Sequence, residues 1–192
     1  MARKYNMTNR SDSSKKTNYS IITATENLLA SGPLDKVTLP AIAKGANVTV
    51  QTVMRHMGSR EGCLKAVAKM VAQRIDSQRG HVKSGDIDSA ISVLMEHYES
   101  DSTLILNLLD QANKGENFAS KMAEKGRKYH RNWVVHCFNP LADLNQQETL
   151  DALVAATDIY VYKLLRHDLG RSFRKTKSII NHLVRGILED KL

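Results

Sequence analysis

Apolar residues recur at intervals of three and four along nearly the whole chain, which is the spacing of one face of an α-helix. The pattern runs from Ile21 to Leu188, and no stretch alternates as a half-buried strand does. The 192 residues include three prolines and ten glycines, so the breakers that separate the strands of all-β folds are scarce. We therefore predict an all-α protein with about nine helices.

Basic charge is concentrated in the first third of the chain. Residues 1–60 hold nine Lys or Arg and three acidic residues, a charge of +6, whereas the other 132 residues hold 19 and 17, a charge of +2. A basic terminal third indicates a polyanionic partner, either nucleic acid or an anionic membrane surface. A solvated basic tail without any partner is the alternative. Residues 1–16 are rich in Ser, Thr, Asn, Lys and Arg with almost nothing to bury, and we expect them to form a flexible basic arm.

Several function classes find no support in the sequence. Cys63 and Cys137 lie far apart, which fits neither a disulfide framework nor a zinc site. The N-terminus lacks the apolar core of a signal peptide, and no run approaches the ~18 apolar residues of a membrane span. The seven histidines include no pair at i, i+4, and no phosphate-binding glycine loop or serine nucleophile motif occurs. We expect a cytoplasmic protein that is not an enzyme, with no metal, cofactor or membrane partner.

The segment Leu39–Met57, LPAIAKGANVTVQTVMRHM, has the spacing of a helix-turn-helix. Such a motif needs an apolar contact and a small crossing residue in its first helix. It also needs a turn residue that tolerates positive φ, for which Asn is the best choice after Gly, and two apolar residues beyond the turn. These positions are held, in order, by Ile42, Ala43, Asn47, Val48 and Val53. A plain helical hairpin inside a core is the alternative.

The second helix of this motif carries side chains suited to a major groove. Gln can pair with adenine and Arg with guanine, while the methyl groups of Thr or Val can contact that of thymine. The residues expected to face DNA bases are Thr49, Val50, Gln51, Thr52 and Arg55.

The motif and its flanks, from Val37-Thr38-Leu39 to Cys63-Leu64, resemble the N-terminal domain of the TetR family of transcriptional regulators. The resemblance extends from Ile21 to Val67. It implies a helix-turn-helix DNA-binding domain followed by a divergent helical domain that binds a small-molecule effector and dimerises. It also places Thr38, His56 and Arg60 at positions that contact DNA phosphates. The first of these begins a helix and the last opens the next one, as phosphate contacts can; their alternatives are a cap, a packed hinge and a surface charge.

Three residues depart from the family pattern. Asn47 stands where the family usually has Gly, and Met57 where it has Phe, a core site that Met can also fill. Met54 stands where the family has a Tyr that donates to a phosphate, and a thioether cannot donate. This departure keeps open a second hypothesis, a small-molecule-binding helical protein whose degenerate helix-turn-helix does not bind DNA.

The resemblance divides the chain into three parts: the arm at 1–16, the helix-turn-helix DNA-binding domain at 17–60, and the helical effector-binding and dimerisation domain at 61–192. Polar or aromatic side chains beside apolar stripes are candidates for the effector pocket, with ordinary core packing as the favoured alternative. These candidates are Tyr98, Asn107, Tyr129, Trp133, Asp158 and Tyr162, with His130 beside them. Asp158 has apolar helical neighbours, so we expect it to be partly buried and to need a partner.

Apolar stripes on the last two helices predict a homodimer face within residues 146–190, since one short helix reads too few bases by itself. Packing within the monomer is the alternative. The stripes comprise Leu150, Leu153, Val154, Val161, Ile180, Leu183, Val184 and Ile187. Together these features predict a regulator that binds a palindromic double-stranded DNA operator as a homodimer, and we expect it to be a repressor released by its ligand. A basic protein that binds membrane surfaces through its arm is a third hypothesis.

Overall fold

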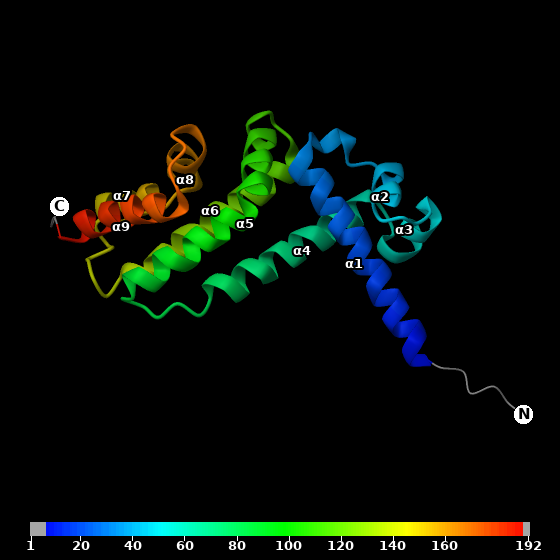
Figure 1. Ribbon diagram of the computed structural model, residues 1–192, viewed down its shortest axis with the longest axis horizontal. Helices are drawn as coiled ribbons and strands as arrows, with labels where there is room; N and C mark the ends of the chain where they lie inside the picture. The colour runs from blue at the N-terminus through cyan, green and yellow to red at the C-terminus, as the bar shows by residue number, and fades with distance from the viewer. Residues whose placement is uncertain (1–6, 190–192) are drawn as a thin grey trace, which may run out of the picture. The chain divides into compact units, whose positions relative to one another are not determined.

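The computed structural model describes residues 7–189, and every regular element within them is helical, which confirms the all-α prediction (Figure 1). The chain forms two compact units, one ending at Ala72 and the other beginning at Gln73. We call them the N-terminal unit and the C-terminal unit.

The N-terminal unit consists of three helices, a short turn and the first half of a fourth helix. Its elements are α1 (Met7–Ser31), the 3-10 turn η1 (Leu34–Lys36), α2 (Leu39–Gly45), α3 (Val50–Met57) and the start of α4 (Arg60–Arg79). Both α2 and α3 pack against α1 and against each other. The fully buried side chains that join them include Ile21, Leu29, Ile42 and Val53.

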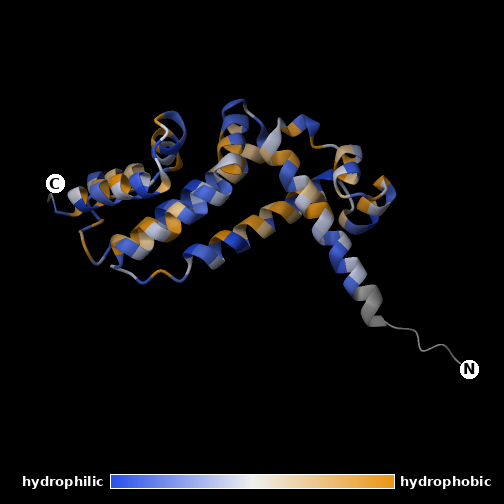
Figure 2. Ribbon diagram, viewed as in Figure 1, coloured by the Kyte–Doolittle hydropathy of each residue, from blue (hydrophilic) through white to orange (hydrophobic). Residues whose placement is uncertain are grey.

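Helix α1 begins within the segment that the sequence assigned to a basic arm. Residues 7–16 are helical, and Asp12 to Lys16 are exposed. Beyond the grey start of α1, Figure 2 shows mainly polar residues first and more apolar residues farther along the helix. At residues 12–16, the polar composition that suggested an arm is that of an exposed helical segment. The remaining arm residues, 1–6, lie outside the described residues.

The division between the units falls inside α4, whereas the sequence placed it at residues 60/61. The two compact units separate between Ala72 and Gln73 because the first half of α4 is buried with the N-terminal unit. Cys63, Leu64 and Val67 are all inaccessible to solvent or nearly so, and the Cys63 thiol meets Thr25 of α1. Gly58 and Ser59 precede the start of α4, but they do not separate two hydrophobic cores.

The C-terminal unit contains the end of α4 and five further helices. These are α5 (Ile87–Asn113), α6 (Asn117–Phe138), α7 (Gln147–Ala156), α8 (Ile159–Lys163), which continues directly into the π-helical turn η2 (Leu164–Asp168), and α9 (Phe173–Glu189). Helices α5 and α6 pack along each other, and α9 packs against α5 and α7. Ile91, Leu94, Phe138, Leu153 and Tyr162 are among the most deeply buried side chains of this core.

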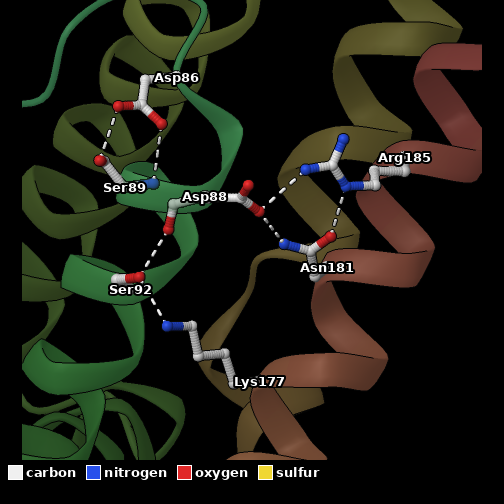
Figure 3. A network of polar contacts seen from close by, with 7 residues as sticks. All are labelled: Asp86, Asp88, Ser89, Ser92, Lys177, Asn181 and Arg185. Atoms are coloured by element: carbon white, nitrogen blue, oxygen red, sulfur yellow. Dashed lines mark hydrogen bonds and ion pairs between the residues drawn. The ribbon is translucent and has the colours of Figure 1, made fainter.

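A polar network fixes α9 against the beginning of α5 (Figure 3). The Asp88 carboxylate accepts from Asn181 Nδ2 at 2.8 Å and from Arg185 Nη2 at 2.9 Å. One turn away on each helix, Lys177 Nζ donates to Ser92 Oγ at 2.7 Å. These contacts set the register of α9, although exposed ion pairs add little to stability.

Half of the predicted dimer stripe packs inside the protomer instead. Leu150, Leu153, Ile180 and Val184 are buried in the core of the C-terminal unit. Helical periodicity reveals an apolar face but not what covers it. The sequence therefore could not show which residues of the stripe are buried within the protomer and which remain exposed. Among the described residues, the large apolar side chains left exposed on α8, η2, the following turn and α9 are Tyr160, Leu164, Leu169 and Leu183.

None of the helices in the described part of the chain is long and apolar enough to cross a membrane. Within residues 7–189, no three His, Cys, Asp or Glu side chains are grouped so that they could hold a metal ion.

Candidate nucleic-acid interface

Two threonines begin the helices of the helix-turn-helix. Thr38 caps α2 by accepting from the Ala41 N–H at 3.3 Å, and Thr49 caps α3 by accepting from the Thr52 N–H at 3.1 Å. Between the helices, Asn47 has φ 53°, the only positive φ of a non-glycine residue among those described. The left-handed turn expected at this position is therefore present, and it directs the Val48 N–H to the Ala43 carbonyl at 3.0 Å.

The apolar contacts of the motif hold α2 and α3 together as the spacing predicts. Ile42, Ala43 and Val53 are buried, and Val48 is half-buried. Met57 is also half-buried, in keeping with a partial core role. The helix-turn-helix prediction is confirmed.

The face of α3 opposite Val53 is open to solvent. Val50, Gln51, Met54 and Arg55 are exposed, and Thr52 is half-exposed. Gln51, Thr52, Met54 and Arg55 line a shallow open hollow. Gln51 and Arg55 are one helical turn apart, so both side chains project from the same face. The hydroxyl of Thr52 lies 3.0 Å from that of Thr49, so these two groups are already engaged with each other.

The three residues expected to contact phosphates have partners within the N-terminal unit. His56 Nδ1 lies 2.5 Å from Asn18 Oδ1 of α1. Arg60 donates through Nε to the Val37 carbonyl and through Nη2 to the Leu34 carbonyl, both at 2.6 Å. These contacts tie α3 and α4 to the elements before them. Thr38 serves as a cap, and Pro40 in the next turn has no N–H to offer a phosphate.

Asn18 is a residue of this region that sequence reasoning missed. Its amide joins α1 to the end of α3 across 38 positions of the chain, and no local pattern could reveal such a contact. Tyr19 beside it is strongly exposed. Its phenol is a hydrogen-bond donor on the surface of the same unit.

The candidate effector residues separate into two groups. Tyr98, Trp133 and Tyr162 are buried; the ring centroids of the two tyrosines lie 5.4 Å apart. Asn107, Tyr129 and Asp158 are half-buried. Asp158 finds the partner that it was expected to need, because its carboxylate caps α8 by accepting from the Tyr160 N–H at 2.8 Å. Burial nevertheless raises the pKa of Asp158.

An arginine links part of the first group. The Arg79 guanidinium is buried, with its carbon 4.1 Å from the centroid of the Trp133 ring and 5.5 Å from that of Tyr129. Its Nη2 lies 3.0 Å from His130 Nδ1. We name Arg79, His97, Tyr98, His130 and Trp133 the Arg79 cluster. Sequence reasoning missed its central residue, because an arginine before a glycine at a helix end is ordinarily a solvated charge.

The imidazoles of the Arg79 cluster are held neutral. Burial, followed by the charge of Arg79, lowers the pKa of His130 to about 3. Burial also lowers the pKa of His97, against the opposing effect of Asp101. Burial by itself would raise the pKa of Asp101, but hydrogen bonds from His97 and Ser100 and the charge of Arg74 lower it to about 2.

The helix-turn-helix coincides with a match to known proteins. Residues 21–67 match the family described as bacterial regulatory proteins, tetR family. No curated protein and no solved structure gives a significant match to the chain. The match covers the two capped helices, the left-handed turn at Asn47 and the exposed face of α3. Residues 21–67 therefore form an N-terminal DNA-binding domain of the kind found in bacterial regulatory proteins of the tetR family.

Proposed function

We propose that this regulator is a repressor that binds a palindromic operator as a homodimer and is released by a small-molecule ligand. The observation that carries the proposal is the exposed face of α3. Gln51 and Arg55 project from it, while Val53 on the opposite side is fully buried in the N-terminal unit. A helix held in this way can enter a major groove without losing its own packing.

Base reading is assigned to the exposed side chains of α3. Arg55 suits a bidentate contact with guanine, Gln51 suits adenine, and the Val50 methyls suit the thymine methyl group. His56 and Arg60 support this face through their contacts with Asn18 and with the carbonyls of η1 and Val37. Their contribution to DNA binding is therefore to position α3.

A binding-site selection from random duplexes tests this assignment. Replacing Arg55 by Ala should weaken binding to the selected site by about 1–3 kcal/mol and relax base preference at one position in each half-site. Arg171→Ala is the matched control, since Arg171 is an exposed arginine of the C-terminal unit. Unchanged affinity and preference in R55A would count against base reading by α3.

The exposed apolar side chains of the C-terminal unit support the proposed homodimer. Leu164 and Leu183 lie on η2 and α9, which pack against each other, and both are about half-exposed. An apolar surface of this kind is typical of a subunit interface. The double variant L164E/L183E should be a folded monomer in light scattering, because two carboxylates would have to be buried in the dimer.

Leu141→Glu is the matched control for the dimer test. Leu141 is exposed to a similar degree, but it follows α6 and lies outside α8, η2 and α9. L141E should remain a dimer. If the double variant also remains a dimer, the interface lies elsewhere.

Release by ligand is proposed to act through α4. This helix begins at Arg60, which is bound to carbonyls of the N-terminal unit, and ends at Arg79 in the core of the C-terminal unit. A ligand weakens DNA binding only if it prefers a conformation in which the reading helices miss half-sites ~34 Å apart. Coupling of ~1–3 kcal/mol weakens DNA binding about 5–150-fold, and operator DNA must weaken ligand binding by the same factor.

Met54 supports a second candidate function, a ligand-binding protein whose helix-turn-helix does not bind DNA. Met54 is exposed on the reading face, where its thioether cannot donate to a phosphate. Salt titrations of binding to the selected palindrome and to random DNA decide between the candidates. A repressor should prefer the palindrome by about 10³-fold or more, whereas the second candidate should bind both weakly and equally.

A further inference from the structure

The C-terminal unit buries a positive charge without an acidic partner. The Arg79 side chain is 3% exposed, and no Asp or Glu among the described residues forms an ion pair with it. Its Nε has no hydrogen-bond partner, and its Nη2 donates to the neutral His130. The remaining groups around it are phenols, a thiol and the Trp133 ring.

The nearest buried carboxylate is already committed to other groups. Asp101 pairs with Arg74 and lies 3.4 Å from His97 Nδ1. Stacking on aromatic rings offsets only part of the cost of removing a guanidinium from water. Among the described residues, the buried guanidinium of Arg79 is therefore left without a carboxylate partner, and a bound anion could supply the missing negative charge.

We propose that Arg79 binds a small organic carboxylate, and that this compound class supplies the effector. The assignment of effector rests on the proposed function; the binding site itself does not. A guanidinium offers a planar pair of donors that matches a carboxylate, and Nε forms one edge of that pair. Tyr98, Tyr129 and Trp133 provide aromatic surface for an apolar body. A single negative charge fits one guanidinium, whereas a phosphate dianion would bring a second, uncompensated charge out of water.

The hydrogen bonds behind Arg79 hold it ready for such a ligand. His130 accepts from Arg79 at Nδ1, so its proton lies on Nε2, 3.1 Å from Thr157 Oγ1. That hydroxyl donates in turn to the Leu153 carbonyl at 2.7 Å. The Trp133 indole donates to the Arg79 carbonyl at 3.2 Å, which holds the end of α4. A ligand that binds the guanidinium therefore acts on the last residue of α4, the helix that follows α3 in the chain.

The only tryptophan of the chain lies beside the proposed site, so its fluorescence reports binding directly. The full-length protein is titrated with hexanoate and benzoate, and then with hexanamide, benzamide and inorganic phosphate. We expect saturable changes with the carboxylates, at least about tenfold tighter than with the matched amides or with phosphate. The carboxylate should also shift the His130 imidazole signals in NMR spectra, because it would bind the guanidinium that donates to this ring.

Three variants complete the test. Arg79→Met keeps the volume and removes the charge, and it should lose the preference for carboxylates over amides while keeping the melting temperature at or above that of the wild type. Arg79→Lys keeps the charge without the planar fork and should bind carboxylates at least about tenfold more weakly. Arg131→Met removes an exposed arginine that pairs with Asp151 on the surface, and it should bind like the wild type. If R79M does not fold, the affinity of R79K and the His130 signals still show whether Arg79 binds carboxylates.

Carboxylates that bind no better than amides, or that bind R79M as tightly as the wild type, would overturn the site. The operator is a separate readout. If carboxylates bind through Arg79 but leave DNA affinity unchanged, the carboxylate site is supported and its role in releasing DNA is contradicted. If neutral compounds release the DNA and R79M responds to them as the wild type does, release by a ligand is supported and the carboxylate effector is contradicted.

Discussion

The two units of this protein use polar residues in opposite ways. In the N-terminal unit the core is apolar except for Thr25, and the functional polar side chains are on the surface or cap helices. Of the buried polar or charged side chains among the described residues, the other nine all lie in the C-terminal unit, including Arg79, His97, Asp101 and His130. Because buried polar groups destabilise a fold unless they are bonded, a core that contains so many must be organised around them.

This difference concerns where each unit places the side chains that would determine its binding specificity: on an exposed helix face or in the core. Under the proposed function, the N-terminal unit supports one exposed helix face that carries its specificity, so its core can consist of any well-packed apolar residues. Under the proposed carboxylate site, the core of the C-terminal unit would itself carry specificity, since its buried charges would determine what it binds. Four tests, from the largest expected effect to the smallest, challenge this contrast.

The first test truncates one fully buried side chain in each unit. Ile42→Ala should cost about 2–5 kcal/mol and unfold the N-terminal unit at lower urea, because a cavity replaces a core contact between helices. Leu153→Ala should do the same in the C-terminal unit. Circular dichroism follows both units, whereas Trp133 fluorescence follows only the second. If I42A shifts both signals equally, α4 couples the units into one folding unit and the contrast weakens.

The second test lowers the pH. Burial lowers the pKa of His130 to about 3 in the folded protein, from an ordinary value of 6.5, so protonation favours the unfolded state. The contribution of His130 to the free energy of unfolding is complete above pH 6.5. It is lost as the pH falls towards 3, at up to ~1.4 kcal/mol per pH unit. Urea titrations followed by Trp133 fluorescence should show this slope between pH 6 and 5. The slope should be smaller in His130→Gln; an equal slope in the variant would assign the effect to other groups.

The third test adds a donor to the reading face. Met54→Tyr places a phenol on an exposed position of α3, and we expect about 0.5–1.5 kcal/mol tighter DNA binding with unchanged base preference. Phosphate contacts position a protein on DNA without reading sequence. Val50→Tyr is the control on the same helix. A gain in both variants would indicate general stacking instead of one phosphate contact.

The fourth test removes an exposed ion pair of the C-terminal unit. Asp88→Ala breaks the contacts with Asn181 and Arg185, yet we expect it to cost at most ~1 kcal/mol of unfolding free energy. Its Trp133 unfolding transition should thus stay near that of the wild type. A loss as large as that of L153A would show that surface charges, and not only buried ones, organise this unit.

The sequence predicted the all-α class, the helix-turn-helix and the turn at Asn47, because each depends on residues within one or two helical turns of one another. A cap needs a hydroxyl three positions before an N–H, and a left-handed turn needs a residue that tolerates positive φ. The sequence also predicted which side of α3 is exposed, since Val53 indicates the buried side.

The tertiary structure decided which apolar stripes and which charges are covered. Ile180 and Leu183 belong to one predicted stripe, yet the first is buried in the protomer and the second is exposed. Arg79 meets Trp133 and His130 more than fifty positions away, and that distant contact removes its guanidinium from water. Burial depends on what the fold brings alongside a residue. A helical period specifies only the face on which the residue stands, so the loss of hydration that makes Arg79 a binding group becomes visible only in three dimensions.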